Sequence, residues 1–297
     1  MIKNYYTLLF ISVISVSLAA IFIVSIDAHP LTIAFYRMFF TTLLILPFVF
    51  FKKKTRKEII NLSKNKIMLM IAIGIILAIH FSLWITSLKL TSVASSVILV
   101  SSHPIIVAPL SHFLLREKLS KINITGITLA IFGIVILVYG NYGFKSISID
   151  TLEGNILALL GGFAAAFYIL GGRVVRKTTS TLTYTSIVYG VSAIVLFLIC
   201  IFYNTQILNI DIRDYQLIFI MAIISGIFGH TLYNWVLKYL KTSLVSVALL
   251  GEPVGSTIFA FIIPWINQIP SQYTIFGGVI IFSGIYMVAI NKSKNNN

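Results

Sequence analysis

Charged side chains are scarce in this 297-residue chain, because Asp, Glu, Lys and Arg together make up only 10% of it. A soluble globular domain carries roughly 25% charged residues. Hydrophobic residues instead account for 58% of the chain, and its mean hydropathy is +1.00. Most of the chain is therefore expected to lie out of contact with water. This composition excludes the two ordinary soluble domains that the length alone would suggest.

Cysteine and acidic residues are also rare. Cys200 is the single cysteine and lies in an apolar run, so no intramolecular disulfide and no cysteine metal cluster can form. The 8 acidic residues face 22 Lys and Arg, which gives a formal charge of +14. The basic residues stand in short clusters between apolar runs, a placement that fits membrane topology signals better than a nucleic-acid patch. We therefore expect a lipid bilayer, and no nucleic acid, as a partner.

The motifs of common enzymes are missing too. The chain has no Walker A motif, no Gly-x-Ser-x-Gly, no His-Glu-x-x-His and no pair of carboxylates within its apolar runs. It therefore cannot hydrolyse ATP alone, and we expect neither an enzyme nor a bound cofactor.

Long apolar runs take up most of the sequence. A bilayer core of about 30 Å is crossed by roughly 20 apolar residues in a helix. Ten stretches qualify, and because they are apolar on every side they indicate helices rather than the alternating strands of a barrel. The predicted fold is therefore an all-α polytopic membrane protein with ten transmembrane helices. They are Tyr5–Ser25, Leu31–Phe51, Ile67–Ser87, Thr91–Leu115, Ile124–Gly140, Asn155–Gly172, Leu182–Tyr203, Gln216–Val236, Ser243–Ile266 and Thr274–Ile290.

The basic residues predict the orientation of these spans. With the N-terminus in the cytoplasm, 18 of the 22 Lys and Arg fall on the cytoplasmic side, and seven of these lie between the second and third spans. The outer side holds only Lys89, Lys145 and Arg213, and Arg37 lies within a span. The positive-inside rule therefore predicts a multi-pass protein of the cell membrane with both termini in the cytoplasm.

The two halves of the chain resemble each other. Leu88 precedes Pro104 by sixteen residues, and Leu237 precedes Pro253 by the same distance. His80 with Trp84, and His230 with Trp235, come before these landmarks, and a pair of glycines seven residues apart follows in each half. We therefore predict one five-helix repeat over residues 1–141 and a second over 150–297. Because five is odd, the second repeat must be inverted, and inverted repeats place a substrate site near the midplane.

Several local sequences carry a family resemblance. His-Pro-Leu-Thr-Ile-Ala-Phe-Tyr-Arg at 29–37 enters the second span, and Leu-Arg-Glu-Lys-Leu-Ser at 115–120 follows the fourth. Gly126-x6-Gly133 and the Glu-Pro-Val of 252–254 come later. With the five-plus-five layout, the chain resembles the EamA-type members of the drug/metabolite transporter superfamily over nearly its whole length. The resemblance implies export or uptake of small metabolites such as amino acids, driven by a proton gradient or by exchange.

Glu252 and His103 are the sharpest candidates for a substrate- or proton-binding site. An ionisable group in the bilayer costs on the order of 2.5–3.5 kcal/mol on insertion scales, so such groups usually face a bundle interior or a wet cavity. Glu252 is the only acidic residue deep within a predicted span. It could carry a proton or pair with a cationic substrate group. His103 takes the matching place in the other half, and each residue directly precedes a proline that favours a helix break.

Other polar and aromatic residues complete the candidate site. Arg37 could bind a substrate carboxylate, pair with Glu252 or extend to the outer surface. A polar and aromatic wall from the third and eighth spans suits an amphipathic solute, although tryptophans also anchor span ends. The remaining candidates are His80, His230, Trp84, Asn234, Trp235 and Tyr36.

The leading interpretation is a secondary transporter that moves a small metabolite, an amino acid or a similar organic solute, by alternating access. A metal-ion transporter built on the intramembrane histidines and Glu252 is an alternative, although no two of them show close ligand spacing such as His-x3-His. An intramembrane enzyme, or a receptor or other non-transport membrane protein, also stays open at this point.

Overall fold

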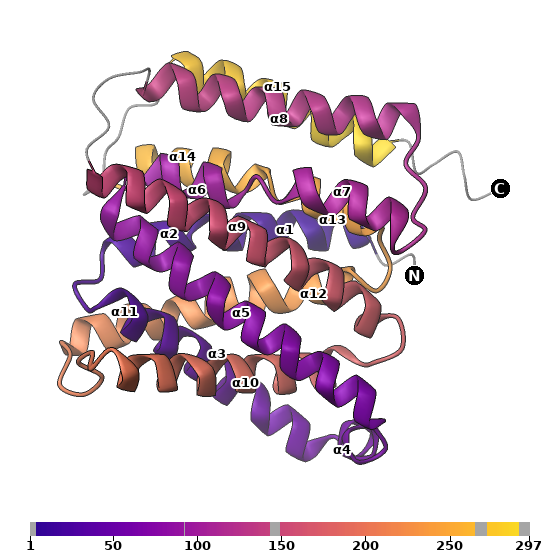
Figure 1. The fold of residues 1–297 in the computed structure, drawn as a ribbon, viewed down its shortest axis with the longest axis vertical. Coiled ribbons are helices and arrows are strands. Elements are labelled where there is room, and N and C mark those ends of the chain that lie inside the picture. The colour runs from indigo at the N-terminus through magenta and orange to yellow at the C-terminus, as the bar shows by residue number, and fades with distance from the viewer. Residues whose placement is uncertain (1–3, 92, 143–148, 265–271, 291–297) are drawn as a thin grey trace.

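The computed structural model describes residues 4–91, 93–142, 149–264 and 272–290, and within these ranges the chain is helical with no strand (Figure 1). The helices are α1 (Tyr5–Ser17), α2 (Ala19–Val24), α3 (Pro30–Phe51), α4 (Lys53–Ile60), α5 (Lys64–Leu90), α6 (Val93–Val100), α7 (Pro104–Phe113), α8 (Lys121–Tyr142), α9 (Ile149–Arg176), α10 (Thr181–Phe202), α11 (Ile212–Met221), the π-helix η1 (Ala222–Thr231), α12 (Leu232–Val236), α13 (Thr242–Ala248), α14 (Gly251–Ile262) and α15 (Gln272–Ile290).

Eight helical segments in the described residues are long and apolar enough to cross a membrane. They are Tyr5–Val24, Pro30–Phe51, Lys64–Leu90, Ser95–Phe113, Leu152–Arg176, Thr181–Phe202, Ile212–Val236 and Thr242–Ile262. Each overlaps one of the predicted spans. Shorter apolar stretches at Lys121–Ile136 and Ile275–Val288, within α8 and α15, lie at the fifth and tenth predicted positions. The all-helical, multi-pass prediction is confirmed, with eight segments that meet the criterion for a span.

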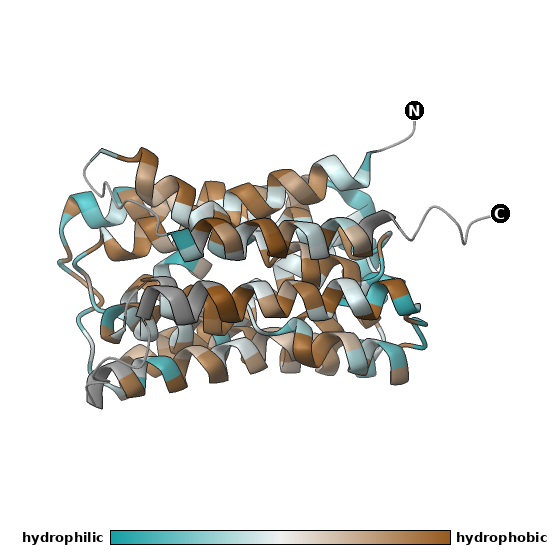
Figure 2. Cartoon of the chain, turned by 90° about the horizontal axis from the view of Figure 1, so that it is seen from above, coloured by the Kyte–Doolittle hydropathy of each residue, from teal (hydrophilic) through white to brown (hydrophobic). Residues whose placement is uncertain are grey.

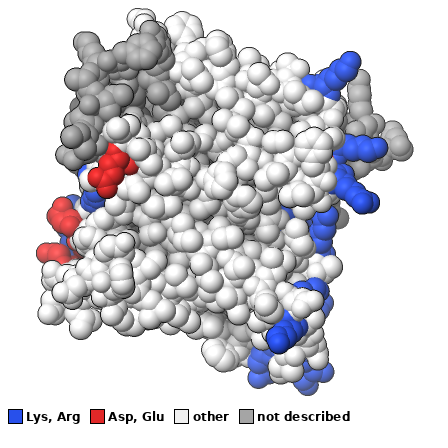
Figure 3. Space-filling view, viewed as in Figure 1, with Lys and Arg blue, Asp and Glu red and all other residues white. Residues whose placement is uncertain are grey.

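The surface of the bundle is apolar in the middle and charged at its ends. Figure 2 shows brown, hydrophobic helices with teal residues toward their ends. In Figure 3, Lys and Arg gather mainly at the right edge and leave a broad uncharged band across the molecule. Large apolar side chains such as Phe10, Phe132 and Leu198 are exposed in the helices. Lipid tails rather than water suit such a surface.

Helix starts follow local sequence signals. The side chain of Asn4 accepts a hydrogen bond from the Thr7 amide at the start of α1, and Ser180 caps α10 in the same way through Thr183. Pro30 occupies the first position of α3, where its missing N–H costs no hydrogen bond. These caps satisfy backbone groups that a helix end leaves without partners.

Two of the candidate spans are interrupted just before a proline. The span of α6 and α7 breaks between Val100 and Pro104, and the span of α13 and α14 breaks between Ala248 and Gly251. His103 lies in the first interruption, while Glu252 stands in the first turn after the second. The helix breaks expected at Pro104 and Pro253 are therefore present at both places. They put the two strongest candidate residues at or beside turns that interrupt the regular α-helix.

Helices α8 and α15 pack along each other at glycine contacts. A Cβ added at Gly126 would lie 2.8 Å from the Gly284 carbonyl oxygen, and one added at Gly133 would lie 2.8 Å from the Gly277 carbonyl oxygen. The two pairs of glycines noted in the sequence thus meet each other in reverse order. Glycine at these positions lets two helix backbones approach closely, which is a common packing device in membranes.

Candidate functional site

A central cavity of about 40 Å³ lies among the helices, and six of the nine predicted site residues line it. Room of this size holds a few water molecules. The predicted residues that line the cavity are Arg37, His80, Trp84, His103, His230 and Glu252. They come from α3, α5, the α6–α7 break, η1 and α14, which are far apart in the sequence. The fold therefore gathers most of the ionisable groups of the spans at one place.

Arg37 is the most deeply buried charged group of the cavity, with 1% of its surface exposed. It follows the first residue of α3 by seven positions, a rise of about 10 Å into the helix. Its guanidinium carbon lies 4.4 Å from the centre of the Phe81 ring and 5.6 Å from that of Trp84. Both Nη atoms are buried without a hydrogen-bond partner in the structure. The side chain is thus held by aromatic rings, not extended to the surface.

Two histidines of the cavity are fixed by backbone carbonyls. The Nδ1 atom of His80 lies 2.9 Å from the Gly161 carbonyl oxygen of α9, and that of His103 lies 3.1 Å from the Ser101 carbonyl oxygen. Because a carbonyl oxygen only accepts, each Nδ1 carries the proton of these bonds. In the uncharged ring Nε2 is then an acceptor. The His80 ring also stacks on Trp84, with 5.9 Å between ring centres.

His230 lies on the π-helix η1, the one π-helical element in the described residues. Its Nδ1 atom lies 3.3 Å from the Tyr233 hydroxyl, and its ring is 5.2 Å from that of Phe81. π-helical turns have i→i+5 backbone hydrogen bonds in place of the i→i+4 bonds of an α-helix, and they are frequent at functional sites. The position of His230 therefore follows from a local irregularity of its span.

Glu252 reaches the cavity from the first turn of α14. Its backbone N–H donates to the Leu249 carbonyl across the interruption at 2.9 Å. Within the part of the chain that the structure describes, the ion pair with an N–O distance of 4.0 Å or less is the one between Arg173 and Glu117. Glu252 therefore forms no ion pair there with Arg37 or with another basic group. The cavity thus presents one guanidinium and one carboxyl group that do not touch each other.

Three predicted residues lie outside the cavity lining. The Tyr36 hydroxyl donates to the Ile207 carbonyl at 3.1 Å and lies 3.3 Å from the Tyr215 hydroxyl. The Trp235 ring packs against the rings of Tyr5 and Tyr239, 5.5 and 5.0 Å away between centres. Asn234 is fully buried one layer behind the cavity, where its Nδ2 donates to the Tyr168 hydroxyl at 2.6 Å.

Tyrosines are the part of the site that the sequence analysis missed. Tyr168 and Tyr233 line the cavity, and Asn234 links Tyr168 to Tyr189 through hydrogen bonds of 2.6 and 3.3 Å. Tyr184, Tyr168 and Tyr189 are each no more than 1% exposed. A buried tyrosine hydroxyl needs a partner, so several tyrosines inside apolar runs were a usable signal for a polar interior.

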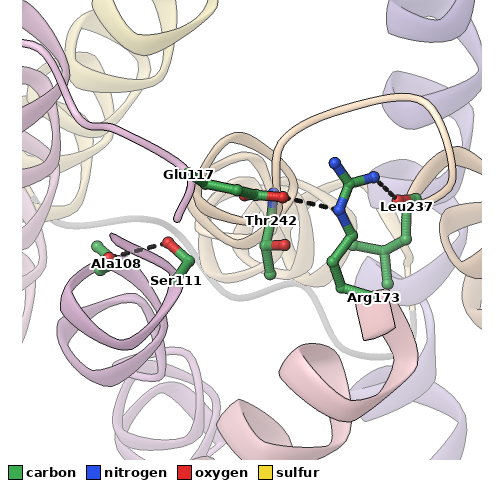
Figure 4. Close-up of polar contacts among 6 residues, drawn as sticks. All are labelled: Ala108, Ser111, Glu117, Arg173, Leu237 and Thr242. Carbon is green, nitrogen blue, oxygen red and sulfur yellow. Dashed lines mark hydrogen bonds and ion pairs between the residues drawn. The ribbon is translucent and has the colours of Figure 1, made fainter. Parts of the chain in front are cut away.

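A second polar cluster ties segments together at the end of the bundle that carries most basic residues. Figure 4 shows Glu117 between two other segments, where one carboxylate oxygen accepts from Arg173 Nε at 2.7 Å. Its other oxygen accepts from the Thr242 backbone N–H at 2.7 Å, at the start of α13. Arg173 also donates from Nη1 to the Leu237 carbonyl. Glu117 therefore connects the segment after α7 to α9 and α13.

Glu58 of α4 and Asp214 of α11 serve similar structural purposes. Glu58 accepts from the Ser180 backbone N–H at 2.8 Å and from the Thr183 hydroxyl at 2.7 Å, which fastens α4 to the start of α10. Burial by itself would raise the pKa of Glu58, but these hydrogen bonds and the nearby Arg176 hold it below its usual value. Asp214 accepts from the backbone N–H groups of Asp27 and Ala28, at 3.3 and 2.9 Å.

The candidate metal ligands do not form a metal site in this arrangement. Over the described residues, no group of three or more His, Cys, Asp and Glu side chains is placed to hold an ion. Although His80, His103, His230 and Glu252 line one cavity, they are not brought together as ligands.

Known proteins resemble the chain over nearly its whole length. A model of the "EamA-like transporter family" matches residues 3–139 and again 152–290. An "Uncharacterized transporter" of Archaeoglobus fulgidus is 26% identical over 275 residues, which cover 90% of each chain. "Uncharacterized transporter YyaM" of Bacillus subtilis is 26% identical over 280 residues, which cover 89% of this chain and 88% of that one. A solved structure described only as "Crystal structure of protein" shares the fold, with a TM-score of 0.78, 16% identity and 99% of both chains covered.

Proposed function

Because the chain belongs to the EamA-like transporter family, we propose that it is a secondary transporter of a small metabolite, an amino acid or a similar organic solute. The observation that carries the proposal is the central cavity, where Arg37 and Glu252 meet three histidines inside a bundle of apolar helices. Intramembrane ionisable groups are costly and usually mark a transport path. Membership of a transporter family also points to transport rather than catalysis.

The substrate moves by alternating access between two inverted five-helix repeats, over residues 1–141 and 150–297. Two separate matches of one family model support this division. Helix packing supports it as well, because the main contacts of α9 with the third and fourth spans have counterparts when each span is exchanged with the one five places later. Thus α5 packs on α9 as η1 packs on α1, and α6 packs on α9 as α14 packs on α1. With α8 and α15 counted as the fifth and tenth spans, each repeat holds five.

The bundle spans the cell membrane with both termini in the cytoplasm. The positive-inside rule supports this orientation, because Lys and Arg gather at the same edge of the molecule as the start of α1 and the end of α15 (Figures 1 and 3). Acidic residues are visible at the opposite edge of the same face. The Glu117–Arg173 cluster then lies on the cytoplasmic side, and the contacts of Asp214 lie on the outer side.

A metabolite enters the cavity only after helices move. The cavity volume of about 40 Å³ suits a few water molecules, whereas ligand pockets usually measure about 300–1,000 Å³. The interruptions at His103 and before Glu252 are natural places for such movement, because tighter turns replace the regular helical hydrogen bonds there, as where the Ile105 N–H donates to the Ser102 carbonyl and the Glu252 N–H to the Leu249 carbonyl. Interrupted helices at the substrate site are a recurring feature of transporters with inverted repeats.

Coupling, by proton or by exchange, runs through Glu252. The other acids described above, Glu58, Glu117 and Asp214, each accept two hydrogen bonds from neighbouring segments. Glu252 faces the cavity instead, where a proton or a cationic substrate group can reach its carboxyl. It is therefore the acid most able to change its partner during a transport cycle.

Uptake into proteoliposomes tests the proposal. The purified chain is reconstituted, and uptake of labelled amino acids and related metabolites is measured with and without an imposed pH gradient. We expect saturable uptake by the wild type and its loss in Glu252→Gln. Glu153→Gln is the matched control, since Glu153 is an exposed acid at the outer start of α9, and it should transport normally. The same vesicles are tested with divalent metal ions.

Three outcomes would count against the proposal. Full uptake by Glu252→Gln would remove that residue from the mechanism. Saturable transport of a metal ion, and of no organic solute, would replace the metabolite by a metal. Binding of a metabolite without any translocation, in folded protein, would favour a receptor over a carrier.

A further inference from the structure

A second hollow of the bundle, here called the lateral groove, lies apart from the central cavity. Its volume is about 650 Å³, and it is bounded by α1, by the interrupted span of α13 and α14, and by α15. The two hollows share no lining residue. Helix α1 and the residues after it turn Val16 and Ala19 to the cavity, whereas Val13 and Ser17 line the groove. The lateral groove is therefore separate from the site described above.

The packing of α15 leaves the lateral groove open to the surface of the bundle. Helix α15 packs mainly along α8 and only partly against α13 and α14. In Figure 1, α8 and α15 lie together at the top of the view, with α14 below them. Phe10, Ile258 and Phe282 line the groove and are also exposed, so they form its rim. Since the bundle spans a membrane, this opening faces lipid.

The lining of the lateral groove favours hydrocarbon over water. Its polar side chains are those of Tyr6, Ser17 and Tyr286, and the Ser17 hydroxyl donates to the Val13 carbonyl of its own helix at 2.8 Å. A buried water molecule needs about two to four polar partners, which these walls do not provide. Proteins also leave few spaces larger than a water molecule empty. An apolar guest therefore suits the groove.

The length of the lateral groove matches one leaflet of a bilayer. Tyr6 and Ser17 are eleven positions apart on α1, which is a rise of about 16 Å. Half of a bilayer core of about 30 Å measures about 15 Å. Tyr6 lies near the start of α1 and Tyr286 near the end of α15, so both lie at the cytoplasmic end in the proposed orientation. The groove thus covers the depth of an acyl chain of the cytoplasmic leaflet.

The cytoplasmic end of the lateral groove is polar and basic. Tyrosine rings are common at headgroup depth. Lys241 directly precedes α13, whose Leu244 lines the groove. Lys121 begins α8, where the Asn123 side-chain amide donates to the Val288 carbonyl near the end of α15 at 3.5 Å. Basic residues at this surface attract anionic lipid headgroups. An apolar helix of a second copy would match the walls but not this charged end.

We propose that the lateral groove binds an acyl chain of an anionic phospholipid from the cytoplasmic leaflet, with the headgroup beside Lys121 and Lys241. This lipid site rests on the proposed orientation in the membrane and goes beyond the proposed transport function, since it does not depend on the cargo. Ala248 and Gly251, at the two ends of the α13–α14 interruption, line the groove, while Glu252 lines the cavity. The bound chain therefore packs against that interruption from the groove.

Lipid binding by the wild type is the first test. The full-length protein in detergent is freed of lipid and titrated with palmitoyl-oleoyl phosphatidylglycerol, with phosphatidylcholine of the same chains, and with glycerol phosphate, which has no acyl chain. The melting temperature reports binding to the folded state, and native mass spectrometry counts the lipids retained. We expect one phosphatidylglycerol per chain, no stabilisation by glycerol phosphate, and about fivefold or weaker binding of phosphatidylcholine, because one lysine near an anionic headgroup contributes about that factor.

Two variants fill the lateral groove. Ala248→Phe, on its buried floor, and Ile14→Trp, on its exposed rim, should weaken phosphatidylglycerol binding by about tenfold or more, since loss of two buried methylenes already costs that factor. Ala72→Phe and Ile79→Trp are the matched controls, because both residues are exposed on α5 outside the groove, and they should bind as the wild type does. The rim variant decides the question where the floor variant does not fold.

A third variant tests the headgroup end. Lys121→Gln combined with Lys241→Gln should reduce the preference for phosphatidylglycerol over phosphatidylcholine by about fivefold or more and leave phosphatidylcholine binding unchanged. Lys53→Gln combined with Lys57→Gln is the control, since both lysines are exposed on α4 and remove the same charge.

Four outcomes would overturn the lipid site. They are equal binding of the two lipids by the wild type, unchanged phosphatidylglycerol binding in folded Ile14→Trp, an unchanged preference after both lysines are replaced, and stabilisation by glycerol phosphate alone. A groove-filling variant that turns a dimer into a monomer, with the number of bound lipids unchanged, would assign the groove to a second copy instead. Uptake of solutes into vesicles is measured separately. Uptake without the lipid site would leave the transporter standing, and the lipid site without any uptake would remove the transporter alone.

Discussion

The Glu117 cluster offers a direct test of how the cytoplasmic end of the bundle is held together. Glu117 accepts from Arg173 Nε and from the Thr242 backbone N–H, each at 2.7 Å, and Arg173 also contacts the Leu237 carbonyl (Figure 4). The N-cap residue of α13, Lys241, makes no side-chain cap, so Glu117 provides that cap from another segment. The perturbation is Glu117→Ala, alone and combined with Arg173→Ala.

The size of the effect follows from burial. The two side chains are only 8% and 13% exposed, so the pair is largely withdrawn from water. Removing one partner of a buried ion pair costs about 3–5 kcal/mol, and loss of a helix cap costs about 0.5–2 kcal/mol. Because this pair lies at the end of the bundle, where water can partly replace the lost partner, we expect the lower part of that range, about 3 kcal/mol, for Glu117→Ala.

A double-mutant cycle measures the part that belongs to the pair. The free energy of unfolding is determined by denaturing titration in detergent for the wild type, both single variants and the double variant. We expect the double variant to lose less than the sum of the singles by at least about 1 kcal/mol. Lys118→Ala is the control, since this neighbouring side chain is exposed and should change stability little. Additive single losses, or an equal loss in Lys118→Ala, would refute the reasoning.

Two further predictions concern stability. Gly284→Ala should destabilise by about 1–3 kcal/mol, because a Cβ there would meet the Gly126 carbonyl and lie 2.7 Å from the Ala130 backbone nitrogen, and overpacking a tight contact costs this much. Gly278→Ala on the same helix should be nearly neutral, since its closest neighbour would be Val254 Cγ1 at 3.4 Å; equal melting temperatures for the two variants would contradict this. Because hydrogen bonds hold the pKa of Glu58 below its ordinary value, Glu58 stabilises the folded state at neutral pH and loses this effect as pH falls below the ordinary pKa of a glutamate and through the lower pKa of the folded state. The stability advantage of the wild type over Glu58→Gln, followed from pH 7 to pH 3, should therefore shrink in acid, and a constant difference would count against the assigned hydrogen bonds.

The features of the fold that could be predicted from the sequence are those that depend on one stretch of the chain alone. Membrane crossing depends on the apolar length of one stretch, so Leu31–Phe51 could be found without knowing its neighbours, and the structure has α3 at Pro30–Phe51. The interruptions before Pro104 and Pro253 were equally local, because proline lacks the N–H that a helix interior requires. The cost of burying an ionisable group is also a property of one residue, which is why Arg37 and Glu252 stood out.

Contacts between distant segments were beyond the sequence. Trp235 follows His230 by five positions, and the sequence analysis placed both in one wall of the site. The Trp235 ring instead packs on Tyr5 and Tyr239, while His230 lines the cavity. The sequence does not place Tyr168 beside the site, because only the fold brings its hydroxyl to Asn234, 66 positions away. Such pairs depend on which face each helix turns toward its neighbours. A span that is hydrophobic on every side has no distinct apolar face, so its sequence does not specify this orientation.

The acids show how the two kinds of information combine. The sequence separated Glu252 from the other seven only by depth, and depth alone is compatible with a hydrogen bond between helices. The structure gives Glu58, Glu117 and Asp214 two hydrogen bonds each, all to groups in other segments. Those carboxylates are fixed by the fold, and moving them would release helix ends. Glu252 instead shares a cavity with Arg37, whose Nη donors are without hydrogen-bond partners, so the half-buried carboxyl and the buried guanidinium that could change partners face the same space.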